Sequence, residues 1–170
     1  MALQRKLWAL NQAFATDGAL IELADQAPSR AIMLVFLATA SAAAAVTTRS
    51  FVEIGNGVAA SLIEVHAQIG ADAIQANTAI EIRTGADAVV DHAKIVAGHN
   101  PGLHLSHVDL SLGRGAIYRG FQLTQATATT RNEGAVKLVG EGGRYDFSGV
   151  ALGRGSEHLD TSLTITHAAP

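Results

Sequence analysis

The sequence predicts a parallel β-helix, a solenoid in which each turn of the chain stacks on the previous one. Three observations support this prediction: apolar residues alternate with period two, glycine corners recur at similar spacing, and the apolar residues are small. Apolar residues make up 48% of the 170 residues, but aromatic residues make up only 5%. Ala, Val, Ile and Leu must therefore fill the core, which suits narrow stacked strands.

The N-terminal stretch is expected to be a helix that leads into the solenoid. Within residues 1–18, the segment KLWALNQAF places Leu7, Leu10 and Phe14 on one helical face. The TDG that follows ends this pattern, and an extended pattern takes over. We therefore predict a helical lead-in over residues 1–18 and a β-helix core over residues 19–170.

The most apolar run of the chain is AIMLVFLATASAAAAV, residues 31–46. It holds 16 residues, which is short against the ~20 apolar residues of a membrane-spanning helix. The first residues of the chain also lack the pattern of a secretory signal peptide. We therefore expect a buried strand at residues 32–37, an alanine-rich turn after it, and a cytoplasmic protein with no membrane partner.

Four later segments share one pattern, an alternating apolar strand that ends at a glycine corner. HVDLSLGRGA at residues 107–116 is an example, and a second extended stretch follows each corner. Glycine suits such corners because it adopts positive φ without a steric clash. The last inward residues of the strands, with a fifth strand included, are Ile54, Ile82, Leu112, Leu138 and Ile165. The expected turn glycines are Gly57, Gly85, Gly113, Gly115 and Gly142.

The tetrapeptide LGRG occurs twice, at residues 112–115 and 152–155. A glycine-rich stretch after a strand can bind phosphate, but a helix must then begin directly at its glycines. The residues after the first copy, AIYRGFQLT, predict a strand instead. LGRG is therefore interpreted as a corner between strands, not as a nucleotide-binding loop.

The spacing of 26 to 30 residues, with two strands per period, predicts a right-handed parallel β-helix. A left-handed hexapeptide helix would show a strict six-residue repeat, and the sequence has none. An antiparallel sandwich of short strands with glycine turns is the structural alternative.

Charge and cysteine content exclude several kinds of function. The 12 basic and 15 acidic residues give a formal net charge of −3, without a basic stripe for nucleic acid. The chain has no cysteine. It therefore offers no disulfide, no cysteine nucleophile, and no thiolate ligand for a metal or an iron–sulfur cluster.

Histidines are the candidate metal ligands. His99, His104 and His107 lie within nine residues, but His104 and His107 would point to opposite faces of one strand. Roles on the surface or in a stacked ladder are therefore favoured over a metal site. Three further histidines each follow an extended run and could form such a ladder: His66, His92 and His167.

Three carboxylates, Glu53, Glu81 and Asp109, precede successive corners and could form an outward acidic stripe. A carbohydrate-active β-helix enzyme would use such a stripe, with paired carboxylates as acid and base. A solvated outer face is the plainer interpretation, because the single Trp offers little surface for stacking a sugar. We assign no catalytic and no cofactor-binding residue and expect a chain that is not an enzyme.

Five stretches of the sequence, in one order, resemble the SufB/SufD family of iron–sulfur cluster assembly proteins, and its SufD branch most. These stretches are ALNQAFATDGALIELAD (9–25), TTRSFVEIGNGVAASLIEVH (47–66), AVVDHAKI (88–95), HLSHVDLSLGRGAIYRGFQL (104–123) and EHLDTSLTITHAAP (157–170). The resemblance implies a right-handed parallel β-helix that pairs with SufB and carries SufC ATPase subunits in a SufBCD complex. An iron–sulfur cluster would then be the product of that complex, not a cofactor of this chain.

The resemblance also has gaps. The family continues through further solenoid turns and through helical domains, so we expect a core that is truncated at its C-terminal end. The family's Cys/Ser-His-Gly segment and its SufC-docking helices have no counterpart in the sequence, and we transfer no functional residue. We predict a non-catalytic scaffold that contacts SufB-like and SufC-like subunits and self-associates through open solenoid ends. The alternative is the carbohydrate-active enzyme.

Overall fold

The chain folds into two facing parallel β-sheets with a helix on the outside. The computed structural model describes residues 2–39, 42–69, 72–98, 100–125 and 127–169. One sheet, sheet A, has six strands in the order β1-β3-β5-β7-β9-β11, and sheet B has five in the order β10-β8-β6-β4-β2. The elements are α1 (Ala2–Phe14), β1 (Leu20–Leu23), β2 (Arg30–Thr39), β3 (Ala44–Ile54), β4 (Ala59–Ile69), β5 (Ile74–Thr84), β6 (Val89–Val96), β7 (Asn100–Leu112), β8 (Ile117–Gln125), β9 (Thr127–Leu138), β10 (Arg144–Leu152) and β11 (His158–His167).

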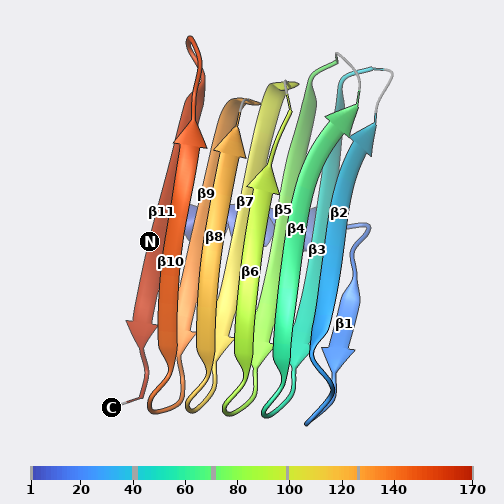
Figure 1. The fold of residues 1–170 in the computed structure, drawn as a ribbon. Coiled ribbons are helices and arrows are strands. Elements are labelled where there is room, and N and C mark those ends of the chain that lie inside the picture. Colours follow the sequence, from blue (N-terminus) through green and yellow to red (C-terminus); the bar gives the residue numbers. More distant parts are fainter. Residues whose placement is uncertain (1, 40–41, 70–71, 99, 126, 170) are drawn as a thin grey trace.

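The chain alternates between the two sheets, so that each strand pairs in parallel with the strand two places further along (Figure 1). Register partners are 26 residues apart at Leu112 and Leu138 and 31 residues apart at Leu23 and Ile54. This arrangement confirms the predicted parallel β-helix, with about five turns. The antiparallel sandwich is excluded because the strand pairs of both sheets are parallel.

Five residues were predicted to be the last inward residues of their strands. Two of them, Ile82 and Ile165, are out of register with the other three. The other three are in register with one another and form the last inward row of sheet A. Ile82 and Ile165 each lie two residues before this row, which is one inward position earlier on the strand. Thr84 and His167 occupy that row instead. The reason is that β5 and β11 run two residues further toward the corner than their apolar pattern indicates.

Glycine turns join sheet A to sheet B at the lower edge of Figure 1. Gly57, Gly115 and Gly142 have φ of 67°, 65° and 70°, a conformation that glycine adopts without strain. Gly85 and Gly113 are close to the neighbouring turn instead: a Cβ on Gly113 would lie 2.8 Å from the carbonyl carbon of Gly85. The corners therefore need glycine for two different reasons.

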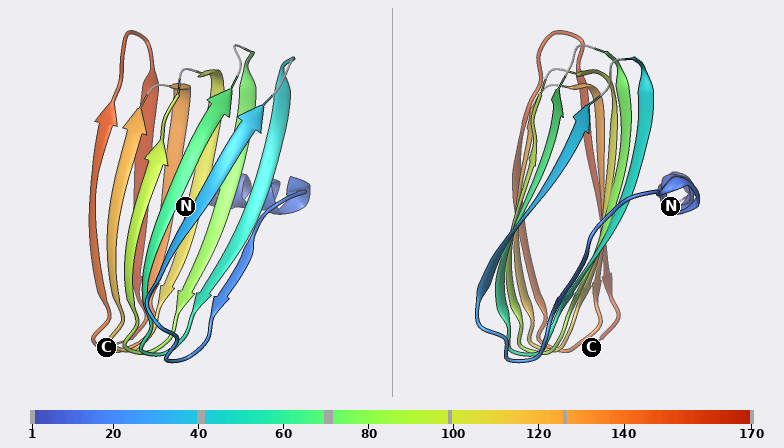
Figure 2. Two further views of the ribbon diagram at one scale, coloured as in Figure 1. Left: turned by 45° about the vertical axis from the view of Figure 1, so that its right-hand side comes forward. Right: turned by 90° about the vertical axis from the view of Figure 1, so that its right-hand side faces the viewer.

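Helix α1 lies against the outer face of sheet A, where it contacts β3 and β5 (Figure 2). The buried Asn11 donates hydrogen bonds of 3.0 Å from Nδ2 to the backbone oxygens of Thr48 and Asn77. The guanidinium of Arg49 lies over the ring of Trp8, 4.0 Å from its centroid. One polar and one aromatic side chain thus hold the helix on the sheet.

Two apolar segments are more exposed than their pattern indicates. The predicted apolar face of α1 points away from the sheet, since Leu10 is 39% exposed and Phe14 is 63% exposed. The run at residues 32–37 lies in β2, which is the edge strand of sheet B. The prediction that this strand is buried is wrong for every second side chain. The exposed ones are Met33, Val35 and Leu37.

The interior is apolar near the glycine corners and polar toward the other end of the strands. Ile54, Ile82 and Leu112 of sheet A pack with Leu62 and Val90 of sheet B, and each is at most 2% exposed. Beyond them the inward positions hold hydroxyl, amide and charged side chains. Among the described residues, no helix combines the length and apolar character needed to cross a membrane.

Candidate functional site

A row of polar side chains runs through the whole solenoid on the inner face of sheet A. Its members are register partners on neighbouring strands of sheet A, one each on β3, β5, β7, β9 and β11. We call them the interior polar row: Thr48, Thr78, Ser106, Asn132 and Thr161. Hydrogen bonds tie the later members together, such as that of 2.8 Å from Ser106 Oγ to Asn132 Oδ1.

Glu64 of β4 is the centre of a buried charged cluster that faces this row. One carboxylate oxygen accepts a hydrogen bond from His66 Nε2, and the other accepts one of 3.1 Å from His92 Nε2. Lys94 Nζ lies 3.9 Å from Glu64 Oε1 and donates to Ser106 Oγ. We call Glu64, His66, His92 and Lys94 the interior charged cluster.

Burial and charge pairing set the ionisation of the cluster. Burial raises the pKa of Glu64, but the charge of Lys94 and the hydrogen bonds from His66 and His92 outweigh it and hold that pKa well below its usual range. Burial lowers the pKa of Lys94, and Glu64 offsets part of this effect. Burial also lowers the pKa of His66. The ion pair is therefore Glu64–Lys94, with His66 as a neutral hydrogen-bond donor.

His92 connects the cluster to a stack of aromatic rings on sheet B. Because its Nε2 donates to Glu64, its Nδ1 accepts from the Tyr118 hydroxyl, 2.5 Å away. Burial raises the pKa of Tyr118 well above its usual range, so the hydroxyl stays protonated. Tyr118 stacks on Tyr145, with ring centroids 5.5 Å apart. These contacts fix the orientation of the His92 ring.

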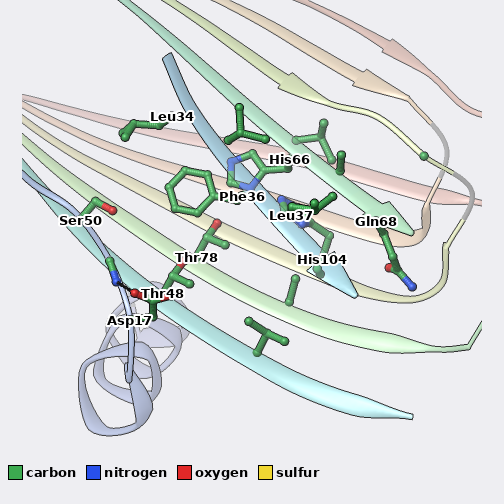
Figure 3. A pocket seen from close by; sticks show the side chains of 18 of the residues that line it. Asp17, Leu34, Phe36, Leu37, Thr48, Ser50, His66, Gln68, Thr78 and His104 are labelled. Atoms are coloured by element: carbon green, nitrogen blue, oxygen red, sulfur yellow. Dashed lines mark hydrogen bonds between the residues drawn. The ribbon is translucent and has the colours of Figure 1, made fainter. Parts of the chain in front are cut away.

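The interior polar row opens at its β3 end into a cavity of about 370 Å³ (Figure 3). Phe36, His66 and His104 lie in this cavity together with the first two members of the row, Thr48 and Thr78. Three buried side-chain atoms there have no hydrogen-bond partner among the described residues. They are Thr48 Oγ1, Thr78 Oγ1 and His104 Nε2.

Comparison with models of known protein families shows to which family this chain belongs. A family model described as the SufBD core domain of SUF system FeS cluster assembly matches residues 36–170, most of the chain. The chain belongs to the SufB/SufD family. Its involvement in SUF iron–sulfur cluster assembly follows from this membership. No curated protein and no solved structure matches the chain.

The SufBD core separates the predicted histidine ligands. His104 points into the solenoid, where its ring meets that of His66 with centroids 4.9 Å apart. His107 lies on the outer side of sheet A, 4.3 Å from the ring of Trp8. His99 lies outside the described residues. Within the described part of the chain, no three His, Cys, Asp or Glu side chains are placed to hold a metal ion.

The predicted acidic stripe is interrupted on the outer face of the SufBD core. Glu81 lies beside Asp109, but Glu53 lies beside Arg83. Glu81 itself pairs with Arg49, and Arg83 Nη2 lies 3.8 Å from it. The three carboxylates of the predicted stripe are therefore not in one row, and arginines neutralise the middle one, Glu81.

Part of the interior charged cluster could have been predicted from the sequence, because side chains alternate between the two faces of a strand. In SLIEVH, Leu62, Glu64 and His66 share one face, so an inward Leu62 places Glu64 and His66 inside as well. The predicted histidine ladder does not form. His66 and His92 both contact Glu64, whereas His167 lies at the corner end of β11.

Proposed function

We propose that the protein is a SufD-like, non-catalytic scaffold subunit of the cytoplasmic SUF assembly complex. In this role it binds a SufB-like subunit and acts together with SufC-like subunits. The family match supports a role in the SUF system, and the five stretches described above support the SufD branch. The scaffold role rests mainly on one observation, an exposed apolar face on sheet B.

The outer face of sheet B carries neighbouring rows of apolar side chains. The central row is continuous, with one residue on each of the five strands in register. It consists of Val35, Val65, Ile95, Leu123 and Val150. Flanking positions add Met33, Leu37, Ile63, Phe121 and Leu152. We call these ten residues the sheet B apolar face.

This face is exposed to solvent in the isolated chain. Val35 is 56% exposed and Phe121 is 43% exposed. Helix α1 lies against the outer face of the other sheet, over β3 and β5 (Figure 2). Large contiguous apolar patches on soluble proteins mark interaction sites. In the next row toward the corners, Arg119 binds Asp91 through bonds of 2.6 and 3.0 Å, so these charges neutralise each other.

The burial of the titratable groups supports a role without catalysis. Glu64, His92 and Lys94 are 2%, 4% and 4% exposed, and their polar atoms bond to one another and to Tyr118 and Ser106. Acid–base catalysis requires a group within hydrogen-bond reach of the substrate. The polar atoms of these groups are already engaged by one another, Tyr118 and Ser106, which leaves them poorly placed to meet a substrate.

Co-purification with SufB-like and SufC-like subunits tests this proposal. We expect the unmodified chain to form a stable complex with the SufB-like subunit. The variants Val35→Lys and Phe121→Lys should each bind that subunit about tenfold more weakly or worse, because each places a charge in an apolar interface. Gln75→Lys is the matched control, because it adds the same charge at an exposed position on the outer side of sheet A. Failure of the unmodified chain to associate, or equal loss for Gln75→Lys, would contradict the proposal.

A further inference from the structure

The cavity at the β3 end of the interior polar row carries an inference that is independent of partner binding. Two of its polar side chains, His104 and Thr78, are 4% and 6% exposed, and neither His104 Nε2 nor Thr78 Oγ1 has a hydrogen-bond partner among the described residues. Thr48 Oγ1 is a third such atom. Leaving a buried polar atom without a hydrogen-bond partner carries a free-energy cost. A bound molecule would remove this cost.

The three atoms come from adjacent strands and gather in one region. Thr48 of β3 and Thr78 of β5 are register partners, and His104 of β7 pairs with Ala76, one inward position before Thr78. Figure 3 shows these side chains around the same space as Phe36 and His66 of sheet B. A single small molecule in the cavity can therefore meet polar groups from sheet A and rings from sheet B.

The sheet B side of the cavity carries two aromatic rings. The rings of Phe36 and His66 are stacked with an interplanar angle of 7° and centroids 4.7 Å apart. Leu34, Val46 and Val96 add aliphatic walls. Flat aromatic molecules pack well against such surfaces.

The electrostatics of the cavity favour an uncharged ligand. Burial lowers the pKa of His66, and burial together with the charge of Lys94 holds the pKa of His104 well below its usual range, so both rings are neutral. Glu64 and Lys94 neutralise each other behind His66. The carboxylate of Asp17 lies among exposed residues at the rim. An ionised ligand would therefore lose its hydration without gaining a counter-charge.

We propose that this cavity binds an uncharged small organic molecule with a flat apolar body and a hydrogen-bonding head group. The body lies along Phe36 and His66, and the head group meets Thr48, Thr78 and His104. The volume of about 370 Å³ falls within the range of small-molecule sites, roughly 300–1,000 Å³. An aromatic primary carboxamide has the required chemistry, because its head group both donates and accepts hydrogen bonds.

Titration of the full chain with benzamide, followed through the NMR signals of the histidine and phenylalanine rings, tests this inference. We expect saturable shifts of the His104, His66 and Phe36 signals at millimolar benzamide. Benzoate and benzylamine, which have similar shape but carry a charge, should bind about tenfold more weakly or worse. Since no partner subunit is present, failure here and failure of the scaffold proposal are distinguishable.

The variant Thr78→Val separates ligand binding from filling by water alone. It keeps the shape of the side chain and removes an unsatisfied hydroxyl, so the fold should be retained with equal or greater stability. Benzamide affinity should fall about two- to tenfold, the effect of one net hydrogen bond. Thr166→Val, exposed on β11, is the control and should leave the affinity unchanged.

Three results would overturn the inference. The first is the absence of saturable shifts at the cavity with benzamide, phenol and nicotinamide alike, which would mean that water alone fills it. The second is benzoate binding as tightly as benzamide. The third is unchanged benzamide affinity in Thr78→Val.

Discussion

Glu64 and Lys94 are both buried inside the solenoid, although each would be strongly hydrated outside it. Removing two charges from water carries a large desolvation penalty, which their attraction and further hydrogen bonds must offset. His66, His92 and Ser106 supply these hydrogen bonds. The charges are thus stable inside only as a complete set, and loss of one member leaves another without compensation.

Glu64→Gln is therefore expected to destabilise the fold by about 3–5 kcal/mol, because Lys94 loses its counter-charge while it stays buried. Urea-induced unfolding measures this change. Adding Lys94→Met to Glu64→Gln should restore part of the stability, since the unpaired charge is then gone. The control is Asp91→Asn, which breaks the exposed pair with Arg119 and should cost only about 0–1 kcal/mol. Equal losses for Glu64→Gln and Asp91→Asn would contradict the role assigned to the cluster.

The buried histidines should make the fold sensitive to mild acid. Burial lowers the pKa of His66 and of His104 from the ordinary 6.5. Between each lowered value and 6.5, the unfolded chain binds a proton that the folded chain does not bind. Stability is therefore full above 6.5 and falls as the pH drops through this window, by up to about 1.4 kcal/mol per pH unit for each histidine.

Urea unfolding at about pH 7.5 and about pH 5.5 measures this dependence. The unmodified chain should be less stable at the lower pH. His104→Leu removes one of the rings whose pKa burial lowers, and it should show a smaller decrease between the two conditions. The same decrease in both chains would show that His104 does not contribute.

At the scale of the elements, the two LGRG corners place the same tetrapeptide in different surroundings. A Cβ on Gly113 would lie 2.8 Å from backbone atoms of the preceding corner. A Cβ on Gly153 would lie no closer than 3.5 Å to the side chain of Leu159. The first corner is confined by its neighbour, whereas the last corner has room for a methyl group.

Gly113→Ala should therefore destabilise the fold by about 1–3 kcal/mol, because the backbone of the stacked corner must move. Gly153→Ala is the matched variant in the second copy and should change stability by less than about 0.5 kcal/mol. Thermal or urea unfolding of both variants checks the difference. A larger loss for Gly153→Ala would contradict the stacking described for the corners.

Sequence patterns predicted where the strands lie better than they predicted which faces of these strands and of the helix are buried. The alternating segments before and after each glycine corner are strands, because period two and glycine turns are local signals. Which face of an apolar segment is covered depends on distant parts of the chain. The strand β2 is an edge strand with Val35 exposed, and α1 docks through Asn11 and Trp8. Strand alternation places Glu64 inside, but the partners that compensate its burial, His92 and Lys94, lie on another strand and are not evident from the local sequence.

The whole molecule has two outer faces of opposite character. On sheet A, helix α1 and pairs such as Arg49–Glu81 cover the surface. On sheet B, the sheet B apolar face stays open, and its central row begins with Val35 on the edge strand β2. For a member of the SufB/SufD family, we infer that this second face is the contact surface through which the scaffold works.

The most direct test of this claim is the alkylation rate of a single introduced thiol, which is unambiguous because the chain has no cysteine. Val35→Cys places the thiol on the sheet B apolar face, and Gln75→Cys places it on the outer side of sheet A as a control. With a saturating SufB-like subunit, we expect slow alkylation of Val35→Cys and an unchanged rate for Gln75→Cys. A complex in which Val35→Cys reacts as fast as in the free chain would contradict it.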